Sequence, residues 1–191
     1  MACETIRFEV RNQVAWVTMN RPESMNAINR LMARELVDAC KQIEDDAAIR
    51  VAIFTGAGDR AFSAGMDLKE RADSAFSPIE RRNQKLSTTI HTQSRAIGAL
   101  SKPTIAAIRG YCVGGGLGFA ATCDLRIYSE DAVFRMPAAR LGLGYSPAGV
   151  RRFMSVLGAA NTAEIFFTAR KFDAREALRM GFVSRVVPVA D

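Results

Sequence analysis

Apolar and polar residues alternate strictly near the start of the chain. Between residues 6 and 10 every second residue is apolar and the others are charged. A period of two is typical of a strand that is buried on one face. Three polar residues, 11–13, separate this segment from a second apolar one at 14–19, so the two segments together predict a β-hairpin.

The segment after Arg21-Pro22 has the period of a helix. Apolar residues recur there at every third or fourth position, which is typical of an amphipathic helix. Asn26 lies just before this pattern and is expected to cap the helix N-terminus. The apolar positions are Ile28, Met32, Leu36, Cys40 and Ile43.

Shorter apolar runs predict the strands of a parallel sheet. The runs 51–55 and 104–108 are almost continuously apolar, a pattern typical of strands that are buried on both faces. Residues 125–128 and 182–187 predict two more strands. The sheet is therefore expected to lie inside the molecule.

Helices are predicted between these strands. Ser77-Pro78-Ile79-Glu80 has an N-cap residue, a proline at the first helical position and a capping box, so it predicts the start of the longest helix. Further helices are predicted near 150–156 and 159–168, and Asp173 is expected to cap a last short one. Strands that alternate with helices predict an α/β protein, and its length suits one domain, 1–191.

Composition excludes several classes of protein. The 191 residues are 49% hydrophobic and 24% charged, the balance of an ordinary globular domain. No apolar run has the length of a membrane span, and residues 1–10 lack the pattern of a signal peptide, so a cytoplasmic protein is expected. The net charge of +6 is scattered along the chain. It fits a phosphorylated small molecule or a nucleic acid as partner, or a solvated surface.

The cysteines do not predict a metal site. Cys3, Cys40, Cys112 and Cys123 form no C-x-x-C pair, and the chain has one histidine. Zinc sites usually need such clusters, so no metal is expected. Cys40 and Cys112 lie in apolar segments and are predicted to be buried, reduced thiols.

Two glycine-rich segments carry the candidate chemistry. Each follows a predicted strand and precedes a helix: Ala61 to Glu70, with Gly65, and Gly110 to Gly118. Glycine allows a sharp turn and a close approach to a ligand, and the N–H groups at a helix start attract anions. Two such turns could form an oxyanion hole for an acyl group. Turns of this kind also cradle nucleotides, although neither matches a dinucleotide or Walker motif.

The order of these segments resembles the crotonase superfamily, the enoyl-CoA hydratase/isomerase family. The resemblance rests on Ala61 to Glu70, Lys102 to Asp124, Glu164 to Val187, and Arg21-Pro22 followed by Asn26-Ala27-Ile28. It implies an α/β fold in which repeated ββα units form a spiral, with short parallel sheets and surrounding helices. It also implies an acyl-CoA substrate, no cofactor apart from the CoA that the substrate carries, and a homotrimer or hexamer.

The resemblance also implies roles for individual residues. The backbone N–H groups of Met66 and Gly115 would form the oxyanion hole. Ala64 would contact the adenine of CoA. The remaining residues that the resemblance places near CoA are Arg21, Met25, Ala27, Arg60, Gly65 and Gly114. Family members usually continue past the point that corresponds to Asp191 with helices that build the trimer, so this segment is expected to be missing or shortened.

The match fails at the two positions where family hydratases have catalytic glutamates. These positions correspond to Gly118 and Ala138, and neither residue can transfer a proton. Tyr145 resembles a tyrosine of family enzymes that decarboxylate malonyl-type thioesters, or it packs beneath its loop. His91 lies where family dehalogenases have a helix histidine, but their nucleophilic aspartate corresponds to Ser146. Asp67 is expected to cap a helix.

Three hypotheses about function follow. The first is an enzyme of the hydratase/isomerase type with an enolate held in the oxyanion hole. The second is a malonyl-type decarboxylase that uses Tyr145. The third is a non-catalytic protein that binds acyl-CoA or RNA, although a nucleic acid partner is not favoured.

Overall fold

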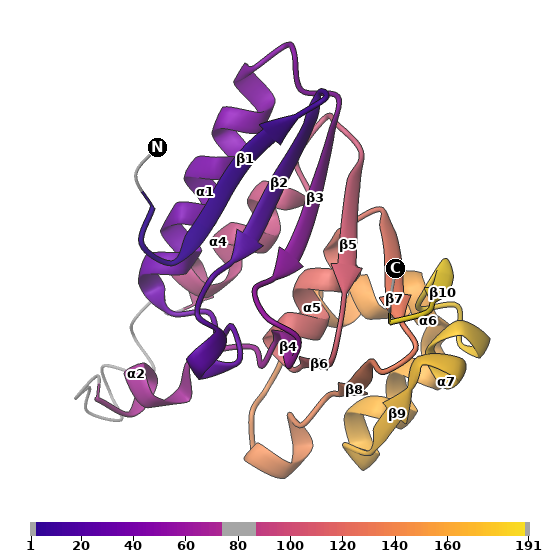
Figure 1. Ribbon diagram of the computed structural model, residues 1–191. Coiled ribbons are helices and arrows are strands. Elements are labelled where there is room, and N and C mark those ends of the chain that lie inside the picture. Colours follow the sequence, from indigo (N-terminus) through magenta and orange to yellow (C-terminus); the bar gives the residue numbers. More distant parts are fainter. Residues whose placement is uncertain (1–2, 74–86, 190–191) are drawn as a thin grey trace.

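Two sheets and a set of helices that cover one side of the larger sheet make up the protein (Figure 1). This computed structural model describes residues 3–73 and 87–189. The larger sheet has six strands in the order β1-β2-β3-β5-β7-β10, and the smaller has four in the order β4-β6-β8-β9. The larger sheet comprises β1 (Ile6–Arg11), β2 (Val14–Met19), β3 (Val51–Gly56), β5 (Thr104–Ile108), β7 (Leu125–Ser129) and β10 (Arg185–Val187). The smaller comprises β4 (Ala61–Ser63), β6 (Tyr111–Val113), β8 (Val133–Arg135) and β9 (Lys171–Asp173).

The chain repeats one unit of two strands and a helix. The first strand of each unit enters the larger sheet and the second enters the smaller sheet, as β3 and β4, β5 and β6, and β7 and β8 show. The predicted hairpin of β1 and β2 is confirmed, and the other strands of the larger sheet are parallel. The helices are α1 (Arg30–Asp45), α2 (Leu68–Asp73), α4 (Ser87–Ile97), α5 (Gly115–Thr122), α6 (Pro147–Thr168) and α7 (Ala174–Arg179), with short 3-10 helices η1 (Pro22–Ser24) and η2 (Ala139–Leu141).

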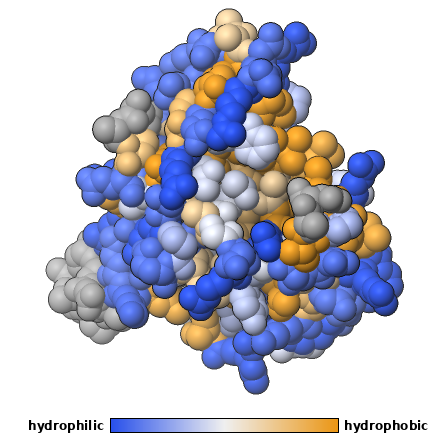
Figure 2. All heavy atoms as spheres, in the orientation of Figure 1, coloured by the Kyte–Doolittle hydropathy of each residue, from blue (hydrophilic) through white to orange (hydrophobic). Residues whose placement is uncertain are grey.

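Burial differs between the two faces of the larger sheet. Ala52 and Phe54 of β3 are fully buried, with Phe54 against Phe119 of α5, whereas Ile53 between them is only partly buried. The prediction that this strand is buried on both faces is therefore wrong. Trp16 and Leu125 lie in the same row across the sheet as Ile53 and are partly exposed. Figure 2 shows this face, where hydrophobic side chains reach the surface among hydrophilic ones.

Helix boundaries differ from the prediction at several points. Asn29, and not Asn26, caps α1, because its side chain accepts a hydrogen bond from the Met32 amide at 2.8 Å. The two helices predicted near 150–156 and 159–168 form one segment, α6, that is interrupted at Gly158, where φ is 74°. Asp173 caps α7 as predicted. The predicted helix start at 77–80 lies outside the described residues, and the last strand is shorter than 182–187.

Aromatic packing fixes α5 between the two sheets. Phe119 of α5 contacts Phe54 of the larger sheet and Phe62 of the smaller one, with ring centroids 5.4 and 5.8 Å apart, both edge to face. All three side chains are almost completely buried. Edge-to-face contacts of this kind add to the free energy of burial. The N-terminus of α5 is thereby held beside β4. In the described part of the chain, no helix combines the length and apolar character needed to cross a membrane.

Candidate active site

The first glycine-rich turn joins β4 to α2. Gly65 has φ 90°, a conformation that residues with a side chain rarely adopt. The backbone on both sides of Met66 pairs with Ile28, because the Ile28 N–H donates to the Gly65 carbonyl at 2.7 Å and the Asp67 N–H donates to the Ile28 carbonyl at 3.0 Å. The turn is thus held by one parallel β-bridge between Ile28 and Met66, referred to below as the ladder, and is not a free loop.

The second turn is shorter than predicted, because α5 begins at Gly115. Gly114 precedes the helix with φ 53°, and its N–H donates to the Arg135 carbonyl at 2.9 Å. The prediction that the helix follows Gly118 is wrong, since Gly116 and Gly118 lie inside α5. The first N–H groups of a helix have no partner within it. The Gly115 amide therefore lies at the positive end of the α5 dipole.

The two turns touch at their glycines. A Cβ atom at Gly65 would lie 2.7 Å from the Gly115 nitrogen and 2.7 Å from the Val113 carbonyl oxygen. A Cβ atom at Gly115 would lie 3.3 Å from the Met66 nitrogen. The amides of Met66 and Gly115 are thus close neighbours on separate elements. Two backbone donors on adjoining turns can bind one oxygen atom when both N–H groups point to it, the arrangement of an oxyanion hole.

The loop between β2 and α1 supports the first turn from outside. Met25 and Asn26 both have left-handed φ values, 52° and 53°. The Met25 carbonyl accepts from the Ala64 N–H at 2.8 Å, and the Ser63 hydroxyl donates to the Asn26 carbonyl at 2.8 Å. Since Ala27 follows directly, the predicted CoA residues of this loop lie beside Ala64 and Gly65.

Asn26 is a structural residue that sequence reasoning misassigned. Its side chain is fully buried and donates to the carbonyls of Ala57 and Ala61, at 3.0 and 2.7 Å. Its Oδ1 accepts from the Arg21 N–H at 3.0 Å. A buried amide must have its hydrogen bonds satisfied, so Asn26 ties three backbone segments together. No sequence signal separated this role from helix capping, because asparagine serves both.

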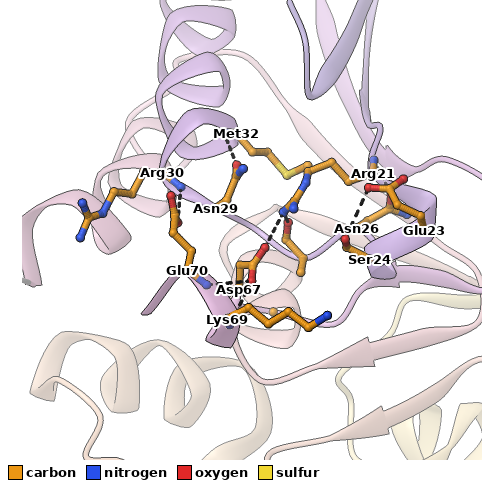
Figure 3. A network of polar contacts seen from close by, with 12 residues as sticks. Arg21, Glu23, Ser24, Asn26, Asn29, Arg30, Met32, Asp67, Lys69 and Glu70 are labelled. Atoms are coloured by element: carbon orange, nitrogen blue, oxygen red, sulfur yellow. Dashed lines mark hydrogen bonds and ion pairs between the residues drawn. The ribbon is translucent and has the colours of Figure 1, made fainter. Parts of the chain in front are cut away.

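Arg21 and Asp67 form an ion pair beneath the turn (Figure 3). Arg21 Nη1 donates to Asp67 Oδ2 and to the Ala27 carbonyl, both at 2.8 Å. The other carboxylate oxygen, Oδ1, accepts from the amides of Lys69 and Glu70, which confirms that Asp67 caps α2. Burial of the Asp67 carboxyl opposes its ionisation, but the hydrogen bonds from Arg21 and from the helix amides lower its pKa overall.

Arg60 lies apart from this ion pair. Its side chain is exposed, and its carbonyl accepts from the Tyr111 N–H at 3.0 Å. The structure thus brings most of the predicted CoA residues to one edge: Met25, Ala27, Ala64, Gly65 and the Arg21 side chain. Arg60 and Gly114 belong to neighbouring loops. Contact of any of them with CoA stays a prediction.

The two positions without a carboxylate lie near α6. A Cβ atom at Gly118 would lie 4.0 Å from Cε2 of Phe153, which is an ordinary contact. Ala138 is buried directly before η2. Glycine at 118 is therefore not required by packing, in contrast to Gly65.

Tyr145 packs against the same helix. Its ring lies edge to face on Phe166, with centroids 5.1 Å apart, and Phe166 contacts Phe153 in the same way at 5.2 Å. Burial raises the pKa of Tyr145 to about 12. At neutral pH the phenol is thus protonated and can act only as a hydrogen-bond partner or proton donor.

Other candidate groups have structural roles or lie outside the description. Ser146 caps α6 by accepting from the Gly149 amide at 3.1 Å. His91 belongs to α4, but its side chain lies outside the described part. Cys40 and Cys112 are buried free thiols, as predicted, and burial raises the pKa of both. Among residues 3–73 and 87–189, no group of three or more His, Cys, Asp or Glu side chains could hold a metal ion.

Comparison with known proteins gives a consistent result over the whole chain. The family model described as enoyl-CoA hydratase/isomerase matches residues 9–191. The short-chain-enoyl-CoA hydratase of Clostridium acetobutylicum is 36% identical over 187 residues, which are 98% of this chain and 70% of that protein.

Solved structures with the same fold include a crystal structure of an enoyl-CoA hydratase/carnithine racemase from Magnetospirillum magneticum. It superposes with a TM-score of 0.93 at 32% identity, over 99% of this chain and 70% of that one. An enoyl-CoA hydratase from Bacillus anthracis superposes with a TM-score of 0.90 at 33% identity, over 98% and 71%.

Proposed function

The chain belongs to the enoyl-CoA hydratase/isomerase family, the crotonase superfamily, and from this premise we propose that it is an enzyme that binds an acyl-CoA thioester and stabilises its enolate. The observation that carries the proposal is the approach of the two glycine turns, where a Cβ atom at Gly65 would reach the Gly115 nitrogen at 2.7 Å. The amides of Met66 and Gly115 hold the thioester oxygen.

The proposed hole acts on charge that develops during the reaction. When the α carbon of a thioester loses a proton or a carboxylate, the electrons move onto the carbonyl oxygen. Two fixed backbone donors and the N-terminus of α5 favour that negative oxygen over the neutral one. Each donor of this kind is worth roughly 3–4 kcal/mol in the transition state.

CoA lies along the edge that the first turn and the β2–α1 loop form. Ala64 contacts the adenine, and Met25, Ala27, Gly65 and Gly114 contact the rest of CoA through their backbone. The exposed guanidinium of Arg60 is available to a phosphate. No cofactor is proposed beyond the CoA that the substrate carries.

The need for proton-transfer groups distinguishes hydration from reactions that only form and protonate an enolate. Hydration needs one group that activates water and another that delivers a proton, and each general acid or base typically contributes 10²–10⁴-fold. Gly118 and Ala138 supply neither. We therefore expect slow hydration and favour reactions in which an enolate forms and is then protonated.

Decarboxylation of a malonyl-type thioester is the second candidate, with the protonated phenol of Tyr145 as its proposed proton donor. Phe166 and Phe153 connect the ring of Tyr145 to the position of Gly118 through successive contacts, and its raised pKa keeps the phenol protonated. The bond between the α carbon and the carboxylate breaks, CO₂ leaves, and the electron pair forms the enolate. The tyrosine hydroxyl then gives its proton to the α carbon, and solvent water reprotonates the resulting phenolate.

Binding and turnover together test the proposal. Crotonyl-CoA and methylmalonyl-CoA are expected to raise the apparent melting temperature, because a ligand that binds only the folded state stabilises it. Hydration is followed by loss of the enoyl absorbance, and decarboxylation by release of CO₂. Neither stabilisation nor turnover with any thioester would overturn the proposal. RNA binding that falls steeply with salt would favour the non-catalytic alternative.

Assembly and location stay predictions. A homotrimer or hexamer is expected and is measured by light scattering coupled to size-exclusion chromatography. The cytoplasm is the expected compartment, and fractionation of cells that produce the protein measures it.

A further inference from the structure

We propose that the Arg21–Asp67 ion pair positions the Met66 amide, so that Arg21 serves the thioester site through Asp67 and not as a phosphate ligand. The proposal rests on the proposed function, because it treats the Met66 amide as a donor to the thioester oxygen. Arg21 and Asp67 touch no reacting atom in this account. They are positioning residues.

The contacts of Arg21 place it across the ladder that holds Met66. One nitrogen, Nη1, donates to Asp67 Oδ2 and to the Ala27 carbonyl, both at 2.8 Å. Asp67 directly follows Met66 on one strand of the ladder, and Ala27 directly precedes Ile28 on the other. The guanidinium therefore holds the two backbone segments of the ladder at a fixed separation.

The ladder determines the direction of the Met66 N–H. In a trans peptide the N–H points away from the preceding carbonyl, and the described chain has no cis peptide bond. The carbonyl of Gly65 points toward Ile28, whose N–H it accepts at 2.7 Å. The Met66 N–H in the same peptide plane therefore points to the opposite side, where Gly115 lies. Any tilt of this peptide turns the donor away from the proposed oxygen.

Charge adds a second reason for the pair. The Asp67 carboxylate is adjacent in sequence to the Met66 donor, and its side chain is only 13% exposed. An unpaired carboxylate at this point would oppose negative charge on the thioester oxygen, because charges interact strongly where water is excluded. Arg21, with 19% exposure, neutralises it.

Four variants separate positioning from phosphate binding. Arg21→Met removes the cation and leaves Asp67 unpaired. Asp67→Asn keeps a residue that can cap α2 but removes the charge. The double variant removes both charges. Arg170→Met is the matched control, because it breaks an ion pair with Glu164 and Glu176 on α6 and α7.

The first readout is the carbonyl stretching frequency of crotonyl-CoA labelled with ¹³C at the thioester carbon, measured in the complex by isotope-edited infrared spectroscopy. Polarisation in the wild-type site lowers this frequency. Arg21→Met is expected to lose at least about half of this decrease, because the hole is weakened. The dissociation constant should change by less than about threefold, since most binding energy comes from the remote part of CoA.

The double variant tests whether the unpaired charge of Asp67 weakens the site when Arg21 is removed. Because Arg21→Met leaves an unpaired buried charge, removing Asp67 as well should restore part of the carbonyl shift. A phosphate-binding role predicts the reverse: the dissociation constant would rise, the bound carbonyl frequency would not change, and Asp67→Asn would rescue nothing. That result would overturn the proposal.

A second readout does not depend on any ligand. In the free protein the amides of Ile28 and Asp67 should exchange with deuterium about tenfold faster in Arg21→Met, since the ladder opens more easily. The Arg170→Met variant should exchange there at the wild-type rate. Unchanged exchange in Arg21→Met would overturn the positioning role, whereas a wild-type protein that shows no carbonyl shift would overturn the proposed function.

Discussion

A Cβ atom at Gly116 would lie 2.5 Å from the carbonyl oxygen of Ser63, which is closer than any side chain can approach backbone. Two positions later in the same helix, a Cβ atom at Gly118 would meet only Cε2 of Phe153, at 4.0 Å. The contact at Gly116 brings α5 against β4, and this contact sets the distance between the two glycine turns.

Alanine substitutions at these two glycines should have opposite effects. Gly116→Ala is expected to destabilise the protein by about 1–3 kcal/mol, because α5 must shift away from β4. Gly118→Ala is expected to stabilise it by about 0.5–1 kcal/mol, because alanine favours a helix interior over glycine. Urea unfolding followed by circular dichroism measures both. Equal effects would show that α5 is not in close contact with β4.

The sequence predicted the glycine turns but not which glycine is sterically required. Gly65, Gly116 and Gly118 look alike in the sequence, and only the fold separates them: Gly65 meets the second turn, Gly116 meets β4, and Gly118 meets neither. The strands of the smaller sheet were also missed, because three residues such as Ala61–Ser63 are too short to show a period of two.

The ion pair that supports the first turn could not be predicted from the sequence. Arg21 and Asp67 are 46 residues apart, and no local pattern relates them. The capping role of Asp67 was predicted because it depends only on neighbouring residues. The ion pair depends on the fold that brings the β2–α1 loop beside β4, so it could not be predicted from local sequence.

Hydration should be limited by the missing carboxylates. We expect the double variant Gly118→Glu, Ala138→Glu to hydrate crotonyl-CoA at least about 10²-fold faster than the wild-type protein, the lower end of what one general acid or base contributes. The matched control is Gly118→Gln, Ala138→Gln, which adds the same bulk without a proton-transfer group. Loss of enoyl absorbance measures the rate, and far-UV circular dichroism shows whether each variant is folded. Equal rates for the Glu and Gln variants would contradict the prediction.

If Tyr145 donates the proton, the decarboxylation rate should not fall as the pH rises through the neutral range. Burial raises its pKa to about 12, so the phenol stays protonated as the pH rises through the neutral range. The rate with methylmalonyl-CoA should therefore show no decline from this group below about pH 11. Tyr145→Phe should lower the rate about 10²-fold or more.

Tyr111→Phe is the control for that experiment. Tyr111 lies on β6, is 39% exposed and contacts Lys171, so it loses one hydroxyl outside the proposed site. Its rate should match the wild-type rate. A Tyr145→Phe enzyme that also keeps the wild-type rate would exclude Tyr145 as the donor and leave it as a packing residue against Phe166.

Glu35 should make stability depend on pH in the acid range. Its Oε1 accepts from the Glu4 amide at 2.7 Å and its Oε2 from the Thr5 amide at 2.9 Å, and it also bonds the Thr5 hydroxyl. Burial opposes ionisation of this carboxyl, but the hydrogen bonds from Thr5 and the backbone lower its pKa overall. A lowered folded-state pKa means that the ionised form contributes stability above the ordinary pKa of about 4.3, and that this contribution disappears as the pH falls through the lower folded-state value.

The comparison with Glu35→Gln tests this contribution directly. Glutamine keeps one acceptor oxygen but places an amide where the second oxygen accepts, so the variant should be less stable by about 1–3 kcal/mol at pH 7. The difference should shrink as the pH falls below about 4, because the wild-type carboxyl is then protonated as well. Urea unfolding at pH 7, 5 and 3 (roughly spanning that transition) measures it. A difference that stays constant across this range would show that the hydrogen bonds from Glu4 and Thr5 stabilise the protein equally whether Glu35 is ionised or protonated.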